Sequence, residues 1–415
     1  MKVFKVLGRI IWIIIAVIAI AVVTCIVLVS VFGTDVKTIK SEESTEEVVP
    51  PEPEITGAET RLLFAGTTFW GRNTNVAARA SELGVKYPFS KLNTLHRENY
   101  DAWIGGLECP VTDKGHNMAE ELNIFKFNCD PDYLPEAAKY FTAFGLGNNH
   151  SDNQGGGTGL TTTRKYLDQN KIQYFGTPKY SGNVQSELAR DTAEATNCDV
   201  VVLPIKVTYD NEETKTIQMP FGFCSAHGVF GIPAEDYLQN MKKYSALMPT
   251  IVMPHMGAEY KSVHDTLRQN LYHKMIDYGV DAVIGDHPHW TQDAEAYKGK
   301  LIVYSMGNFM FDQVFNKEVS RSAAIEANAV VKDVADVDFD KWNELGEGCL
   351  ADKKTCLASI QGAALPRLQI TWTYDYHATT SAGDRIPRLG SDAEQAEIGA
   401  RLKWGAIPAE MKVAK

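Results

Sequence analysis

Short apolar runs separated by helical patterns fill most of this chain from residue 61 onward. The runs are continuous rather than alternating, which is typical of strands buried on both faces of a sheet. They lie at 61–66, 102–107, 142–146, 172–175, 200–207, 216–223, 250–254, 282–284, 301–305 and 365–374. Helical patterns occupy 158–170 and 266–278, the second with its apolar residues on one face. Strands that alternate with helices predict an α/β fold with a largely parallel sheet.

Two later regions depart from this alternation. The runs at 200–207 and 216–223 flank a turn-like Asp210-Asn211 pair, which predicts a hairpin in a second sheet. Residues 316–365 show no clear period, and a polar stretch at 391–404 predicts a last helix.

An uncharged apolar segment at residues 10–32 precedes the predicted domain. At about 1.5 Å per residue, a helix of this length spans a hydrocarbon core of roughly 30 Å, so we expect an N-terminal transmembrane helix. Basic residues precede the segment and four glutamates follow it: Lys2, Lys5 and Arg9, then Glu42, Glu43, Glu46 and Glu47. This bias predicts a single-pass protein of the cell membrane, with residues 1–9 cytoplasmic and the main domain extracytoplasmic. A cleaved signal peptide is the alternative, and it also leaves the main domain outside.

Residues 33–60 are rich in Glu, Pro, Ser and Thr. Such a composition cannot bury an apolar core, so we expect an acidic, Pro-rich, extended tether. The remainder is long enough for one large domain or two.

The net charge of −11 excludes nucleic acid as a partner, because its phosphates require basic clusters. Cys25 lies in the apolar segment, and the other cysteines form three pairs that are close in sequence: Cys109 with Cys129, Cys198 with Cys224, and Cys349 with Cys356. No Cys-x-x-Cys occurs, so a zinc ribbon is not expected. Three disulfides are expected in an oxidising exterior, and free buried thiols are the alternative.

Metal-binding residue types follow four of the predicted strands. They are Glu108 after 102–107, Asn148, Asn149 and His150 after 142–146, His255 after 250–254, and His287 and His289 after 282–284. Because open α/β sheets collect ligands at the ends of their strands, these segments predict one metal site assembled from distant parts of the chain.

Each of these residues also has a plain alternative. His287 and His289 flank Pro288, which limits the freedom of the loop and favours two imidazoles that point the same way. A lone His255 or Glu108 is often an ordinary polar residue, and an Asn-rich segment is often a turn. His150 suits general-acid work because an imidazole titrates near neutrality. Glu259 is expected to orient the imidazole of His255, and a surface acid is its alternative.

Four motifs occur in the order that a known family shows: Gly-Asn-Asn-His at 147–150, His-x-Gly-x-Glu at 255–259, Gly-x-His-Pro-His at 285–289 and Tyr-Ser-Met-Gly-Asn-Phe at 304–309. In this combination the chain resembles the CapA/PgsA family of capsule and poly-γ-glutamate synthesis proteins, which is similar in fold to the calcineurin-like metallophosphoesterases. The resemblance covers residues 61–313 and leaves 314–415 as a C-terminal extension, expected to pack on the same domain.

The resemblance implies a four-layer α-β-β-α sandwich of metallophosphoesterase type, with the site at the strand ends. It also implies a divalent cation of manganese, zinc or iron, and a role in making an anionic envelope polymer beside membrane synthase subunits. Glu108, Asn149, His255 and His287 would complete one metal position, His289 would face a second, and His150 would be the acid. The implied surrounding or substrate-binding residues are Thr67, Arg72, Asn148, Glu259 and Asn308.

The chain departs from the family at two positions. Thr67 stands where the family has Asp, and Gly106 stands where it has Asn. A neutral Thr binds divalent cations poorly, so we expect one firmly bound metal ion rather than two. His150 and the His-Pro-His segment favour a metal-dependent hydrolase or transferase. Thr67 favours a non-catalytic scaffold or export component that holds the anionic polymer or its precursor.

Overall fold

The computed structural model describes residues 53–177, 197–233 and 235–414. The predicted transmembrane helix at 10–32 and the predicted cytoplasmic residues 1–9 lie outside these ranges. Within them, every helix is too short or too polar to span a bilayer.

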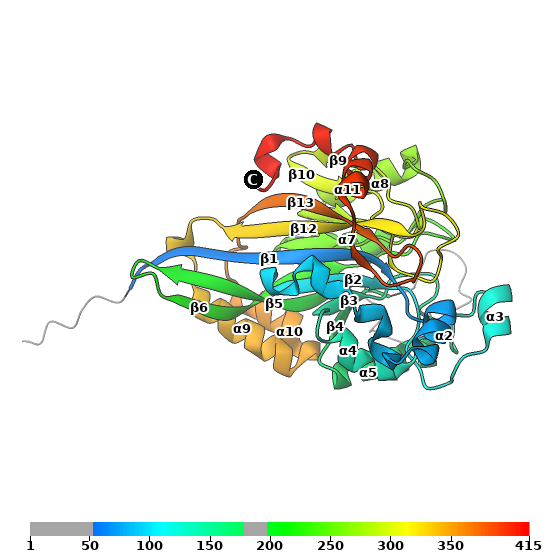
Figure 1. Cartoon of the computed structure of the whole chain (residues 1–415). Helices are drawn as coiled ribbons and strands as arrows, with labels where there is room; N and C mark the ends of the chain where they lie inside the picture. The colour runs from blue at the N-terminus through cyan, green and yellow to red at the C-terminus, as the bar shows by residue number, and fades with distance from the viewer. Residues whose placement is uncertain (1–52, 178–196, 234, 415) are drawn as a thin grey trace, which may run out of the picture. The chain divides into compact units, whose positions relative to one another are not determined.

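The strands of the described chain form one branched, hydrogen-bonded network of mixed direction (Figure 1). They are β1 (Ile55–Thr68), β2 (Ala102–Leu107), β3 (Ala143–Gly145), β4 (Gln173–Phe175), β5 (Cys198–Tyr209), β6 (Thr214–Cys224), β7 (Thr250–Val252), β8 (Ala282–Ile284), β9 (Ala294–Tyr297), β10 (Lys300–Val303), β11 (Asn308–Met310), β12 (Arg321–Val331), β13 (Ile370–Thr380) and β14 (Arg388–Leu389). The α-helices are α2 (Arg72–Ala80), α3 (Met118–Asn123), α4 (Leu134–Ala137), α5 (Gly157–Gln169), α7 (Glu235–Ser245), α8 (Thr266–Asp277), α9 (Phe339–Ala351), α10 (Lys353–Ala363) and α11 (Asp392–Arg401).

The long strand β1 is the fork of this network. One of its edges pairs with β12. The opposite edge pairs antiparallel with β5 over its first half and parallel with β2 over its second half. One branch therefore continues through the parallel strands β2, β3 and β4, and the other runs from β5 through β6, β7, β8 and β10 to β9.

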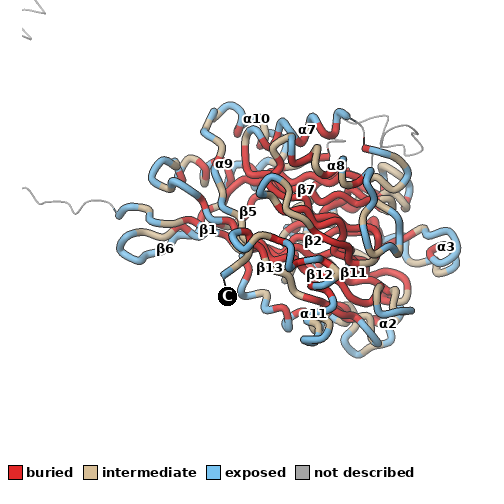
Figure 2. Tube along the Cα trace, turned by 90° about the horizontal axis from the view of Figure 1, so that it is seen from above, coloured by how far each residue is buried: buried red, intermediate tan, exposed pale blue. Residues whose placement is uncertain are grey.

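Alternate residues of β1 enter two hydrophobic cores. Leu62 and Phe64 belong to the core that also contains the apolar residues of β5 to β8 and of helices α7 to α10. Leu63 and Ala65 face the other core, with residues of α4 and α5. Because successive strand residues point to opposite faces, the β1–β2 branch is buried on both sides. Figure 2 shows this buried interior beneath an exposed surface.

The structure changes several sequence predictions. β1 begins at Ile55, inside the segment predicted to be a tether, because Ala58 is buried and pairs with Val207 of β5. The hairpin of β5 and β6 is present, but β1 joins it to the same network rather than to a separate sheet. The sheet is mixed rather than largely parallel: the pairs of β1 with β2 and β11, the run from β2 to β4 and the β6–β7–β8–β10 set are parallel, and β5, β9, β12, β13 and β14 join by antiparallel pairs. The region without a clear period contains β12, α9 and α10.

The six cysteines after Cys25 form the three disulfides expected from their spacing, Cys109–Cys129, Cys198–Cys224 and Cys349–Cys356. The second closes the open end of the β5–β6 hairpin, where Cys198 and Cys224 lie opposite each other.

Thiol titration of the full-length protein tests this pairing. In denaturant without reductant we expect one reactive thiol per chain, from Cys25, because the disulfides survive unfolding. After reduction all seven cysteines should react. Seven thiols before reduction would show that the paired cysteines are free.

Candidate metal centre

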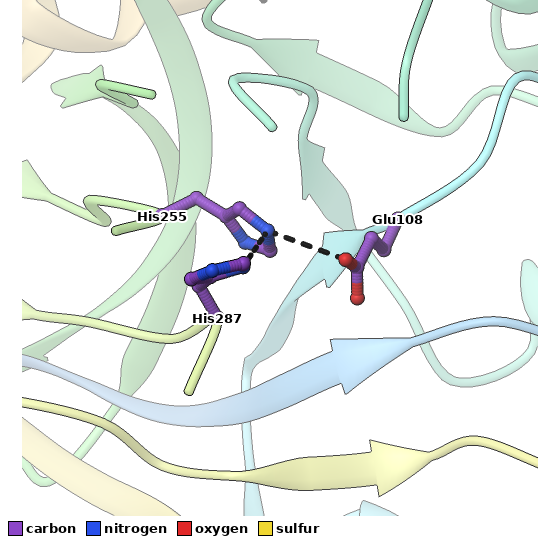
Figure 3. Close-up of side chains that lie close together, drawn as sticks. All are labelled: Glu108, His255 and His287. Carbon is purple, nitrogen blue, oxygen red and sulfur yellow. Dashed lines mark hydrogen bonds and ion pairs between the residues drawn. The ribbon is translucent and has the colours of Figure 1, made fainter. Parts of the chain in front are cut away.

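Three buried side chains from separate strand ends meet at one point of the molecule. Glu108 directly follows β2, while His255 and His287 follow β7 and β8. Their ligand atoms all lie within 4.8 Å of one another. Figure 3 shows the two imidazoles and the carboxylate directed toward this common point.

The Nε2 atom of His255 is the centre of this cluster. It lies 2.9 Å from Oδ1 of Asn149, 3.1 Å from Nδ1 of His287 and 3.4 Å from Oε1 of Glu108. Two imidazole nitrogens, one carboxylate oxygen and one amide oxygen form a donor set that suits a divalent transition metal. The structure therefore brings together four of the five predicted ligands.

The chemistry of Glu108 fits a bound cation. The residue is 1 % exposed, and neither carboxylate oxygen has a hydrogen-bond partner among the described residues. Burial opposes its ionisation, but the neighbouring imidazoles of His255, His289 and His150 lower its pKa to about 2. A buried carboxylate that stays ionised without hydrogen bonds is costly unless a cation compensates it.

Asp286 orients the central imidazole. Nδ1 of His255 donates a hydrogen bond of 2.8 Å to Oδ1 of Asp286, which is itself buried. This bond directs Nε2 toward the cluster, as carboxylates commonly do for metal-binding histidines. Although burial opposes protonation, the carboxylates of Asp286 and Glu108 raise the pKa of His255 to about 10. A cation at Nε2 therefore competes with a proton.

The structure assigns to Asp286 the role that the sequence suggested for Glu259. Glu259 is exposed and lines a cavity above the cluster. Asp286 was present in the Gly-x-His-Pro-His segment, but a residue at the variable position of a motif carries no signal of its own.

Gly106 makes room for Asp286. A Cβ atom on Gly106 would lie 2.2 Å from Oδ2 of Asp286, well inside van der Waals contact. This close approach gives a physical reason for glycine at a position where the family that the chain resembles has Asn.

His287 and His289 do not converge on the same point. Both adopt positive φ angles, 96° and 59°, which L residues rarely adopt. His287 faces His255, and burial holds its pKa well below the usual range, so the imidazole stays in the neutral, metal-binding form. His289 turns aside instead, with Nδ1 2.8 Å from Oδ1 of Asn308 and its ring stacked on Tyr260.

His150 stands at the edge of the cluster. Its Nε2 lies 3.9 Å from Oε1 of Glu108, and its Nδ1 lies 2.8 Å from Oδ1 of Asn153. The ring stacks on Phe127 at 3.9 Å between centroids. Burial lowers its pKa to about 4, so the imidazole is neutral at pH 7. The sequence suggested a value near neutrality because it could not show this burial.

Thr67 lies at the end of β1, opposite Gly106 of β2, and Asn148 follows β3. The hydroxyl of Thr67 is buried at the end of β1 and makes no hydrogen bond within the described chain. Asn148 is structural: Nδ2 donates to the carbonyl of Leu107 at 2.7 Å, and Oδ1 accepts from the backbone N–H of His150 at 3.0 Å. It thereby ties the ends of two strands together.

A cavity of about 510 Å³ opens above the cluster and is lined by Asn149, His150 and His289. Arg72 contributes a cation to its wall. The guanidinium is paired with Asp312 and lies 4.4 Å from the ring centre of Phe127, while Nε makes no hydrogen bond to any residue within 53–177, 197–233 and 235–414. His227, which follows β6, also lines the cavity, and burial lowers its pKa to about 3. The rule that identified His255, a histidine after a strand, could have found it.

The loop between Cys109 and Cys129 forms one side of the cavity. His116 holds this loop together, because Nδ1 lies 2.6 Å from Glu121 and Nε2 lies 3.2 Å from Asp130. Burial opposes protonation, but the two carboxylates raise the pKa of His116 to about 9. The imidazole is therefore charged at neutral pH.

Comparison with known proteins gives matches across this region. The family model for the bacterial capsule synthesis protein PGA_cap matches residues 61–313. The capsule biosynthesis protein CapA of Bacillus anthracis is 25% identical over 269 residues, which cover 64% of this chain and 63% of that protein. The PGA biosynthesis protein CapA of Bacillus subtilis (strain 168) is 37% identical over 76 residues, 18% of this chain and 20% of that protein. The matches thus span less than two thirds of these relatives.

Two solved structures match with low scores. The protein TT1561 of Thermus thermophilus matches at 9% identity and a TM-score of 0.31, over 64% of this chain and 93% of that one. A putative 5'-nucleotidase from Staphylococcus aureus in complex with alpha-ketoglutarate matches at 12% identity and a TM-score of 0.35, over 66% and 51%. Scores of this size do not establish a shared fold.

Substitution of Gly106 tests the role of Asp286 in metal binding. Asp286→Ala should weaken manganese binding roughly 10- to 100-fold, because His255 loses its orienting partner. Gly106→Ala should weaken it similarly, because its methyl group displaces the Asp286 carboxylate. In the variant that carries both substitutions, Gly106→Ala should weaken manganese binding little beyond the effect of Asp286→Ala. Dissociation constants come from electron paramagnetic resonance titration.

Gly348→Ala is the matched control, because a Cβ at Gly348 would meet no atom of the described chain within 4 Å. Fully additive effects of the Gly106 and Asp286 substitutions would contradict the coupling.

His116 should stabilise the protein in a pH-dependent way. Because its pKa is raised on folding, the stabilisation is complete below about pH 6.5 and disappears as pH rises through 9. His116→Gln should therefore lower the free energy of unfolding by on the order of 2 kcal/mol at pH 6 and by little at pH 9.5. Urea unfolding of the full-length protein measures this difference.

His96→Gln is its control, since His96 is 63 % exposed. An equal loss of stability at both pH values in His116→Gln would contradict a role of its charge.

Proposed function

Because the chain belongs to the PGA_cap family of bacterial capsule synthesis proteins, we propose that it is a metal-dependent hydrolase or transferase that acts on an ester or phosphoester bond during the biosynthesis of capsule or poly-γ-glutamate. One observation carries the catalytic part of this proposal. The buried, ionised carboxylate of Glu108 has no hydrogen-bond partner in the described part of the chain and lies among two imidazoles and an amide, next to a cavity lined by Asn149 and His150.

The finer fold type and the location are part of the proposal. Two cores on opposite faces of the β1–β2 branch, with helices on their outer sides, support a four-layer α-β-β-α sandwich of metallophosphoesterase type. The uncharged segment 10–32 and the three disulfides support an extracytoplasmic domain attached to the cell membrane. The anionic polymer or its precursor would be the substrate, beside membrane synthase subunits.

Glu108, Asn149, His255 and His287 would hold one divalent cation of manganese, zinc or iron. When bound, such a cation supplies Lewis acidity and makes water a stronger acid. Asp286 keeps Nε2 of His255 directed at the site, and His287 stays neutral as a ligand.

Arg72 and His150 would act on the substrate. The guanidinium in the cavity wall binds the negative charge of an ester. His150 holds its own proton on Nδ1, which donates to Asn153, so Nε2 is free to accept another. An anionic ester in the cavity raises the pKa of this imidazole, and Nε2 then carries the proton that the leaving oxygen needs.

Thr67 supports a second candidate, a non-catalytic scaffold or export component. Its hydroxyl is neutral and occupies the position of the Asp found in the family. A mechanism with two metal ions requires both to hold the attacking and leaving oxygens. Among the described residues, one position has such a donor set. In this role a single metal would bind carboxylates of the polymer.

Metal content and hydrolysis together separate the two candidates. The full-length protein should hold about one manganese ion per chain and hydrolyse p-nitrophenyl phosphate. His150→Ala should lower the rate roughly 100-fold or more with unchanged metal content, because the proton carrier is lost. Thr67→Asp should raise the metal content toward two ions per chain. Elemental analysis measures the metal content of the unmodified protein and of each variant.

His96→Ala, at an exposed histidine outside the described cavity lining, is the control for the loss of an imidazole. Bound metal with no hydrolysis that depends on His150 would favour the scaffold. A protein that binds no metal under excess manganese or zinc would exclude both candidates.

A further inference from the structure

Exposed apolar side chains gather at the mouth of the cavity. Ile124 and Phe125, which follow α3, are 65 % and 57 % exposed, and Phe230, which follows β6, is 65 % exposed. All three line the cavity. Phe315, which follows β11 and is 67 % exposed, lies edge-on to the cavity-lining Tyr260, with ring centres 6.1 Å apart.

We refer to Ile124, Phe125, Phe230 and Phe315 as the apolar rim. Its members come from three segments that are distant in sequence. α3 lies at the end of the molecule toward which β1 runs, and it projects there as an exposed element (Figures 1 and 2). The rim thus surrounds the same end of the sheet that carries the candidate metal centre.

This clustering differs from ordinary surface exposure. Single exposed apolar residues are normal in soluble domains, and Val76, Leu350 and Leu389 are examples here. Several large apolar side chains around one cavity instead mark a surface that is covered when a ligand binds. The rim therefore indicates that part of the ligand is apolar.

The floor of the cavity has the opposite character. The lining there includes Arg72 and the imidazoles of His150 and His289, together with Asn149, which touches the buried cluster through His255. Asp152 and Glu259 also line the wall, so the attraction for an anion depends on Arg72 and the cation. With a divalent cation bound beside Arg72, the site beneath the apolar rim fits a molecule with an anionic head and an apolar chain.

We infer that the cavity binds an amphiphilic phosphate ester, with its phosphate at the floor and its hydrocarbon chain against the apolar rim. This inference rests on the proposed function and deepens it by naming the class of substrate. The amphiphile is a lipid-linked ester rather than the free, fully polar polymer. A rim that simply rests on a bilayer surface is a different outcome, which the experiment distinguishes.

Equilibrium binding of two alkyl phosphates tests the inference. The full-length, manganese-loaded protein is placed in phosphatidylcholine nanodiscs, so that no detergent competes for the rim, and empty nanodiscs provide the reference. Octyl phosphate should bind at least about tenfold more tightly than ethyl phosphate, because added methylene groups leave water. Isothermal titration calorimetry gives both constants without requiring turnover.

Rim substitutions should reduce this preference. The Phe125→Ser and Phe315→Ser double variant should lower the octyl-to-ethyl ratio to about threefold or less. Leu350→Ser, at a residue 52 % exposed on α9, should keep the ratio of the unmodified protein. Since these side chains are exposed, unfolding is not expected, and the thermal midpoint of each variant checks this.

The outcomes separate this inference from the proposed function. Equal binding of the two phosphates, or a preference for octyl phosphate that persists in the double variant, would overturn the inference that the cavity binds an amphiphile. An unchanged octyl-to-ethyl ratio in the double variant would leave the bilayer surface, rather than the ligand, as the partner of the rim. A tenfold preference for octyl phosphate without hydrolysis of either ester would exclude the proposed hydrolase activity and still support the amphiphile site. If the protein binds neither octyl phosphate nor ethyl phosphate, both the proposed hydrolase and the amphiphile site are excluded.

Discussion

The burial of an ionised carboxylate is the constraint on which this site depends. Glu108 is held at the end of β2, and no described residue donates a hydrogen bond to either of its oxygens, so its charge must be balanced by the imidazoles around it or by a cation. The surrounding structure serves this arrangement. Asp286 directs His255 at the carboxylate, and Gly106 leaves the space that Asp286 occupies. A substitution at Asp286 or Gly106 therefore changes the position of His255, either directly or through Asp286.

The fork in the sheet explains how residues so distant in sequence meet. β1 pairs with β2 and β5 along the same edge, so the branch that carries Glu108 is joined to the branch that carries His255 and His287. The polar residues that follow these strands then face each other across the joint. The loop closed by Cys109–Cys129 begins immediately after Glu108 and brings Phe127 onto His150. The metal-binding floor and the cavity wall are consequently parts of one connected structure.

The sequence predicted the parts of the site that depend on strand ends. Glu108, Asn149, His255 and His287 each follow an apolar run, and this pattern was enough to place them near one another. Asp286, His116 and the apolar rim could not be found in this way, because their roles depend on side-chain direction and on contacts between distant loops. The start of β1 at Ile55 was missed for a similar reason, since pairing with β5 overrides a composition that favours an extended tether. β12, α9 and α10 lacked a clear period, although tertiary packing orders them.

The central claim is that Glu108, Asn149, His255 and His287 hold one divalent cation. Anomalous diffraction from crystals of the full-length protein grown with manganese tests it most directly. The account predicts a single strong peak about 2.0–2.3 Å from ligand atoms of these four residues. It also predicts that the peak disappears in Glu108→Gln, while His255 keeps its bond to Asp286. A peak at another position, or no peak in crystals grown with excess manganese, would contradict this claim.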